Sequence, residues 1–252
     1  MVAALIAGLA IYKKWAPPAQ QALKTETGPT NSVPPFATKE PTTYEATRII
    51  TYSLTSPQTG VSEQPHVDRI LLARDGEQRR EEYEAGALGS IVFLENFNGR
   101  FILLTQPKLY ADAKQSNASE ESELQVEAEL MSPDFLLHES NAPTQFQKIG
   151  PETVTGRLAT KYRVVTSASG STASHESLIW VDETLGMPIA TQDTSTSGND
   201  SILVSMELQN IRTAVDPQTF ALPADYRKVD LSQIIDLIRD RKAKPTVQGD
   251  HK

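Results

Sequence analysis

Two adjacent carboxylates, Asp182 and Glu183, are the residues whose spacing first suggests chemistry. They stand in LIWVDETLGMPIATQ, residues 178–192, between a run of apolar residues and a second run that resumes after Pro188. Carboxylates act as general acids and bases when a partner group and a cleft position them. Here Gly186 and Pro188 follow closely, and Asp, Gly and Pro are the residues that chains use at turns. We therefore interpret the pair as a corner between two strands.

The other chemically active side chains show no catalytic spacing. Four histidines are scattered along the chain, at His66, His138, His175 and His251, and no P-loop, GxSxG or HExxH motif is present. The absence of cysteine excludes disulfides, thiol chemistry, cysteine zinc sites and an acylated N-terminal cysteine. We expect a protein that is not an enzyme, with no catalytic residue, no metal site and no cofactor.

Charge and composition limit the class of partner. The net charge is −8, whereas a nucleic-acid surface needs a basic stripe, so we expect no nucleic-acid partner. Arg79-Arg80 and Glu81-Glu82 lie on one expected strand, where neighbours point to opposite faces. We interpret them as solvated cross-strand charge pairs.

The N-terminal region has the layout of a domain displayed from a membrane. In residues 1–15 an apolar run from Val2 to Tyr12 precedes Lys13-Lys14 and Trp15. This run is shorter than the ~20 residues of a spanning helix, so we expect an inner-membrane anchor or signal remnant whose start lies upstream; a buried N-terminal helix is the alternative. Residues 16–41 contain six prolines and few apolar residues, as extended linkers do. We expect a folded domain at 42–244 and a disordered tail at 245–252.

From Tyr44 onward, apolar residues recur with period two. This pattern predicts about eleven strands, joined by short turns into one curved antiparallel sheet. Asp75-Gly76 and Asn98-Gly99 are signals for two-residue hairpin turns. The expected strands are 44–54, 67–74, 77–84, 91–97, 100–105, 108–111, 145–149, 157–167, 174–182, 187–194 and 202–208. The expected helices are 120–130, 133–140 and 231–238, the last with apolar residues at helical spacing.

The hairpin at 91–105 is apolar on both faces. One face carries Ile91, Phe93, Phe97, Ile102 and Leu104, and the other carries Val92, Leu94, Phe101 and Leu103. A simple two-layer sheet would show one polar face, so we expect this hairpin to be covered on both sides. Helices either fill the space inside the curved sheet or leave a ligand cavity there, and the residues leave both alternatives open.

Four stretches resemble the LolA/LolB/RseB-like superfamily of bacterial envelope proteins. They are DRILLARDGEQRREEY (68–83), KIGPETVTGRLATKYRV (148–164), LIWVDETLGMPIATQ (178–192) and VDPQTFALPADYRKV (215–229), and they occur in the order of the family's hairpins and closing segment. The resemblance implies a half-open antiparallel barrel around a few helices that binds acyl chains or regulatory partners. Two departures, the anchor with its linker and the missing acylated cysteine, put a lipoprotein-shuttling role in doubt.

We therefore expect a membrane-tethered periplasmic protein that holds a lipid or lipoprotein acyl chain in a concave, apolar cavity. The expected lining residues are the large apolar residues of the central strands: Phe93, Phe101, Leu103, Tyr162 and Trp180. Large apolar side chains of this kind are more often buried for packing in an ordinary core than for binding a ligand. The alternative is a structural or regulatory module of the envelope, with the barrel filled by its own helices and a protein partner bound at the acidic segment 119–129.

Overall fold

A single sheet, antiparallel except for one short parallel pair at its edge, contains most of the residues that the computed structural model describes, which are 30–37, 40–56, 61–62, 64–113, 144–167, 174–197 and 200–243. Its eleven long strands correspond one to one to the eleven predicted from the sequence. They are β2 (Thr43–Ser56), β4 (His66–Asp75), β5 (Gln78–Glu84), β6 (Ser90–Asn96), β7 (Gly99–Leu104), β8 (Leu109–Asp112), β9 (Thr144–Val154), β10 (Arg157–Ser167), β11 (Ser174–Asp182), β12 (Met187–Ser197) and β13 (Asp200–Arg212). Three two-residue strands complete it: β1 (Thr30–Asn31), β3 (Val61–Ser62) and β14 (Arg227–Lys228).

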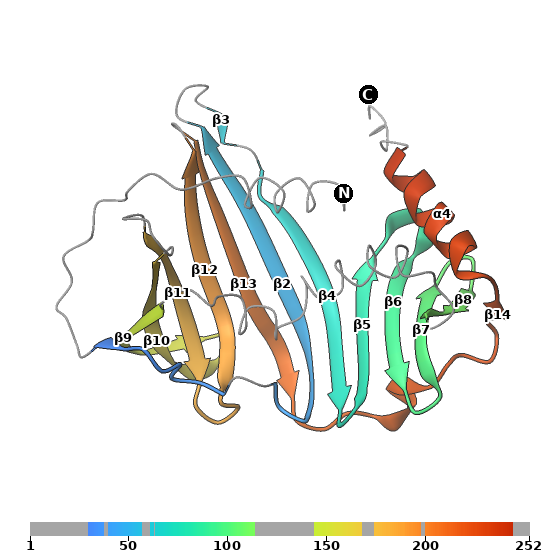
Figure 1. Ribbon diagram of the computed structural model, residues 1–252, viewed down its shortest axis with the longest axis horizontal. Helices are drawn as coiled ribbons and strands as arrows, with labels where there is room; N and C mark the ends of the chain where they lie inside the picture. The colour runs from blue at the N-terminus through green and yellow to red at the C-terminus, as the bar shows by residue number, and fades with distance from the viewer. Residues whose placement is uncertain are drawn as a thin grey trace.

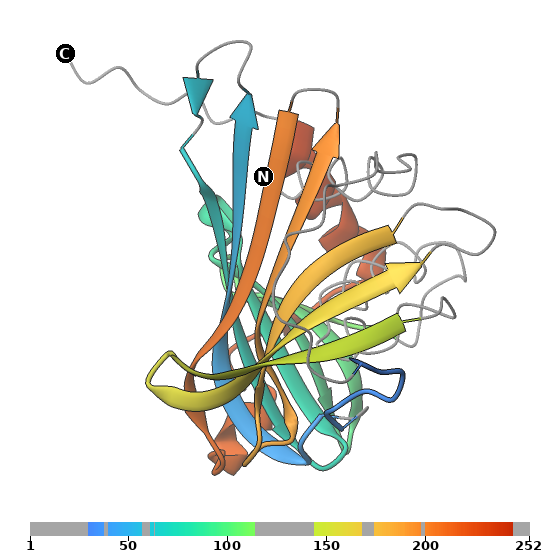
Figure 2. The same ribbon diagram turned by 90° about the vertical axis from the view of Figure 1, so that its left-hand side faces the viewer.

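The sheet is open and curved. Its order is β1-β9-β10-β11-β12-β13-β2-β4-β5-β6-β7-β8-β14, with β3 paired to β2, so β1 and β14 form two separate edges. The sheet bends around the side on which helix α4 (Leu231–Ala243) lies, which we call the concave face (Figures 1 and 2). The predicted fold class, a half-open antiparallel barrel, is therefore confirmed.

The described residues include one α-helix, α4, which confirms the helix predicted at 231–238. The helices predicted at 120–130 and 133–140, the anchor at 1–15 and the tail at 245–252 lie outside the described residues. Within the part of the chain that is described, no helix is both long and apolar enough to span a membrane.

The β6–β7 hairpin is covered on both faces, as its two apolar faces predicted. On the concave face, Ile91, Ile102 and Leu104 pack against α4 through Ile234 and its neighbours. On the opposite, convex face, Val92, Leu94, Phe101 and Leu103 pack against Phe220 of the short helix η3 (Pro217–Phe220). The closing segment of the chain thus covers the outside of the hairpin, and the helix that follows it covers the inside.

The predicted positions of two turns are each wrong by one residue. Asn96 pairs with Gly99, so the loop of the β6–β7 hairpin is Phe97-Asn98, and Phe97 is 85% exposed instead of lying in an apolar row. The Asn96 side chain accepts a hydrogen bond from the Asn98 backbone N–H at 2.9 Å, which closes the loop one residue early. In the β4–β5 hairpin Asp75 pairs with Gln78, and Gly76 takes the first loop position with φ +61°.

The last part of the segment predicted as a linker packs against the sheet. Phe36 lies edge-on to Phe146 of β9, with ring centroids 5.7 Å apart. The Ala37 backbone N–H donates to the Gly186 carbonyl at 2.7 Å, and Glu40 is buried. Described residues upstream of 42 therefore contribute to the folded domain.

Candidate functional site

The five residues predicted to line one cavity lie on two different faces. Paired residues of antiparallel strands share a face, and neighbours along a strand alternate. Phe93 pairs with Ile102 and Tyr162 pairs with Ile179, and the registers across the sheet place both on the concave face. By the same registers, three of the predicted residues project from the convex face: Phe101, Leu103 and Trp180.

The three convex residues have ordinary packing partners. Phe101 and Leu103 belong to the cluster that Phe220 closes. The Trp180 ring lies under the Lys161 ammonium, with Nζ 4.6 Å from the ring centroid, and Lys161 also pairs with Glu152 at 3.2 Å. A cation over an indole face stabilises this arrangement. Trp180 also belongs to a buried cluster with Ala159, Ala190 and Leu208, so all three side chains pack in the core of the described structure.

The central strands present apolar side chains to the concave face. The described helix α4 packs mainly on β7 and β8, at one edge of that face (Figure 1). On β2, β13 and β10, away from α4, the inward side chains remain half-buried: Ile50, Tyr52, Ile202, Val204 and Tyr162. This partly accessible apolar surface on the concave side is the first candidate site.

Below this apolar surface lies a buried network of charged and phenolic groups. The Tyr44 hydroxyl donates to Glu40 Oε1 at 2.7 Å, and Arg74 and Arg79 pair with Glu40 Oε2. The Tyr83 hydroxyl donates to Glu81 Oε2 at 2.5 Å. The interpretation of Glu81 as solvated is wrong: it is 5% exposed, because alternation turns it toward the concave face.

Burial raises the pKa of two phenols of this face, Tyr52 and Tyr83. Burial, followed by the charge of Asp68, raises the pKa of Tyr52 to about 12. Burial and the adjacent Glu81 carboxylate raise the pKa of Tyr83 well above its ordinary value. Both hydroxyls therefore remain neutral hydrogen-bond donors well above neutral pH.

Asp182 and Glu183 form the turn that the sequence predicted. Asp182 is 2% exposed, and its Oδ1 accepts from the backbone N–H of Thr184 at 2.8 Å and of Leu185 at 3.1 Å. Its Oδ2 pairs with Arg157 of β10. Burial alone would raise the pKa of Asp182, but the hydrogen bonds from Arg157 and the turn outweigh it and hold that pKa below its ordinary value. The carboxylate is occupied in fixing the corner between β11 and β12.

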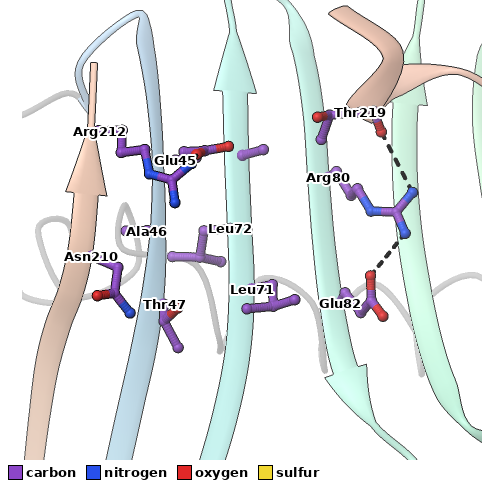
Figure 3. A pocket seen from close by; sticks show the side chains of 11 residues that line it. Glu45, Ala46, Thr47, Leu71, Leu72, Arg80, Glu82, Asn210, Arg212 and Thr219 are labelled. Atoms are coloured by element: carbon purple, nitrogen blue, oxygen red, sulfur yellow. Dashed lines mark hydrogen bonds and ion pairs between the residues drawn. The ribbon is translucent and has the colours of Figure 1, made fainter. Parts of the chain in front are cut away.

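A groove of about 280 Å³ on the convex face is the second candidate site (Figure 3). Leu71, which is 51% exposed, and Thr47 lie on its floor. Arg80 contributes one wall, where it donates to the Thr219 carbonyl at 3.4 Å and pairs with Glu82 at 2.8 Å. Arg212 and Glu45, paired at 2.9 Å, form another wall. Among the described residues, no group of three His, Asp or Glu side chains has an arrangement that would hold a metal.

No family model and no curated protein matches this chain. Solved structures do match it. An uncharacterized conserved protein from Thermus thermophilus aligns over 75% of this chain and 90% of its own, at 12% identity and a TM-score of 0.39. The lipoprotein LppX of Mycobacterium tuberculosis aligns over 68% of this chain and 88% of its own, at 14% identity and a TM-score of 0.32.

MucB, solved alone, aligns over 74% of this chain and 59% of its own, at 15% identity and a TM-score of 0.36. A chain from the Pseudomonas aeruginosa complex of MucA and MucB aligns over 74% of this chain and 58% of its own, at 13% identity and a TM-score of 0.33. This chain is similar to these four structures, each at a TM-score below 0.5.

Proposed function

We propose that this chain is a binding protein of the bacterial cell envelope that holds an apolar ligand, such as a lipid or an acyl chain, against its concave face without catalysing a reaction. The observation that carries the proposal is the set of half-buried apolar side chains on β2, β10 and β13, on the inside of an open sheet. Covering such side chains removes apolar surface from water, which is the main favourable term in binding an apolar ligand.

Two of the five residues first expected at the cavity, Phe93 and Tyr162, fit this site. Both project from the concave face. Phe93 lies beside the edge that α4 covers, and Tyr162 lies on β10, which β11 and β12 separate from β13. The proposed site leaves out Phe101, Leu103 and Trp180, because the strand registers favour the convex face for all three. The revised site centres on Ile50, Tyr52 and Val204.

The N-terminal region supports a location at the membrane. The apolar run in residues 1–15, the basic pair that follows it and the proline-rich segment are suited to tether the domain to the inner membrane. A tethered domain with an apolar concave face is suited to receive a ligand from the lipid surface beside it.

Native mass spectrometry of the full chain, followed by organic extraction, tests this function. The expected result is a copurified lipid or stoichiometric uptake of added oleic acid, with displacement of a fluorescent fatty-acid probe. A chain that neither carries lipid nor binds the probe in a folded state would overturn the proposal.

The convex groove favours a second function, the docking of an envelope protein. An exposed leucine between two ion pairs, one on Arg80 and one on Arg212, has the composition of a small protein-binding surface. Substitution Leu71→Glu should then abolish recovery of a partner that the unmodified chain recovers from envelope extracts. Recovery of the same partner by both chains would exclude the groove as the docking surface.

A further inference from the structure

An arginine lies in the middle of the apolar concave face. Arg48 projects inward from β2, and its cross-strand partners are Ile70 of β4 and Leu208 of β13, both almost fully buried. Arg48 itself is 1% exposed. An ionised group buried among apolar side chains is costly unless hydrogen-bonding partners replace the water that it has lost.

The Tyr83 hydroxyl is a hydrogen-bonding neighbour of the Arg48 guanidinium. Two nitrogens of this guanidinium, Nε and Nη2, are nevertheless buried without a hydrogen-bond partner from the described residues. These two N–H groups lie on the same edge of the planar group and point in parallel. This edge is the one that binds a carboxylate or a phosphate through two hydrogen bonds at once.

The neighbouring acids do not occupy that edge. Glu40 and Glu81 accept from Tyr44 and Tyr83 and pair with Arg79, with 3.6 Å between Arg79 Nη1 and Glu81 Oε1. Asp68, one row away on β4, accepts from His66 Nε2 at 3.0 Å through Oδ1, and its Oδ2 is also unpaired. Since both Asp68 Oδ2 and the Arg48 edge lack a partner, the two do not bind one another.

We propose that the Nε–Nη2 edge of Arg48 binds the anionic head of the apolar ligand, a carboxylate or a phosphate oxyanion. This inference rests on the proposed function, because the apolar part of the same molecule would lie on Ile50, Tyr52 and Val204. Ile50 is the next inward residue of β2 after Arg48, and Val204 pairs with Tyr52. An acyl chain extending from the Arg48 edge along β2 would therefore meet these side chains in order.

The test compares ligands of equal chain length that differ only in the head. Oleic acid, oleyl alcohol and oleyl phosphate are titrated against the full chain by displacement of a neutral fluorescent lipid probe. We expect at least one of the two anionic ligands to bind the unmodified chain at least tenfold more tightly than the alcohol. Preference for oleic acid identifies a carboxylate head, and preference for oleyl phosphate identifies a phosphate head.

Two variants assign the preference to Arg48. Arg48→Met keeps an unbranched apolar stem but removes the donors, and it should bind acid and alcohol within twofold of each other. Arg48→Lys keeps the charge without the two parallel donors and should retain only part of the preference. Alcohol binding by each variant reports that the apolar site is still folded.

The outcomes separate the two proposals. If the unmodified chain binds oleic acid, oleyl phosphate and oleyl alcohol equally, or if Arg48→Met retains the preference, the anion site is wrong while the apolar site stands. In that case Arg48 serves only to balance the buried carboxylates. If the unmodified chain binds none of the three ligands, the proposed function itself fails.

Discussion

Phe93 and Phe101 lie on adjacent strands of the same hairpin, yet they project from opposite faces of the sheet. Phe93 pairs with Ile102 on the side of α4, while Phe101 pairs with Leu94 on the side of η3. No single cavity can be lined by both. This relationship separates the ligand site, on the concave face, from the packing that closes the convex face.

Phe220→Ala should destabilise the fold by about 3–5 kcal/mol, the usual cost of removing a buried aromatic ring. Phe220 is 2% exposed and packs on Val92, Leu94 and Leu103. The matched control is Phe97→Ala, which should change the free energy of unfolding by less than about 0.5 kcal/mol because Phe97 is 85% exposed. Urea denaturation of the two variants measures the difference. Equal effects would contradict the assignment of Phe220 as the cover of the convex face.

Asp182→Asn should lower the free energy of unfolding at neutral pH by about 1–3 kcal/mol, because a buried acceptor loses its charge and leaves Arg157 unpaired. The folded-state pKa of Asp182 is below its unfolded value, so its ionised form stabilises the fold above the unfolded value of ~3.9. This contribution is lost as the pH falls through the folded-state pKa, and the two chains should converge in acid. Glu183→Gln is the control, since Glu183 is exposed and glutamine still accepts from Thr160. A constant difference at all pH values would exclude the charge as its cause.

His175 should titrate above its ordinary pKa, and Asp193→Asn should return that pKa toward ~6.5. The hydrogen bond between His175 Nε2 and Asp193 Oδ2, at 2.5 Å, is the main cause of the raised pKa, and burial opposes it. Since folding favours the protonated form, this pair stabilises the fold fully below the unfolded pKa and loses its effect as the pH rises through the folded-state value. Proton NMR titration of His175 measures the change, with Glu95→Gln on β6 as the control. An unchanged titration in Asp193→Asn would refute the pairing.

Much of this fold is predictable from the sequence because period-two alternation is a local property of each strand. The eleven long strands and the two covered faces of the 91–105 hairpin follow from it. The exact position of each turn does not follow from the alternation, because a side chain such as that of Asn96 can close a loop one residue before the position that the glycine suggests. Pairing of the early Pro-rich segment with β9 depends on contacts far apart in sequence, such as Phe36 with Phe146.

The candidate site was harder to predict than the sheet. Side-chain size selected Phe101, Leu103 and Trp180, but size does not tell a packed core from a binding surface. The informative signal was a charged residue in an inward position: the row Tyr44, Ala46, Arg48, Ile50 and Tyr52 is apolar or phenolic except for one arginine. The buried carboxylate Glu40 is hard to predict because its partners Tyr44, Arg74 and Arg79 lie on three different strands. Glu81 has its partners Tyr83 and Arg79 on its own strand, but its burial depends on the packing of the concave face.

The measurement that tests the concave site most directly is the affinity of the full chain for a fluorescent fatty acid after a matched pair of substitutions. Val204→Lys places a charge on the concave face of β13, and Leu71→Lys places the same charge on the convex face of β4. Thermal unfolding followed by circular dichroism confirms that both variants are folded. We predict that Val204→Lys weakens binding at least tenfold, or about 1.4 kcal/mol, because the charge must be desolvated against the ligand. Leu71→Lys should leave the affinity within twofold of the unmodified chain. Weakened binding in Leu71→Lys together with unchanged binding in Val204→Lys would contradict the concave site and move the ligand to the convex groove.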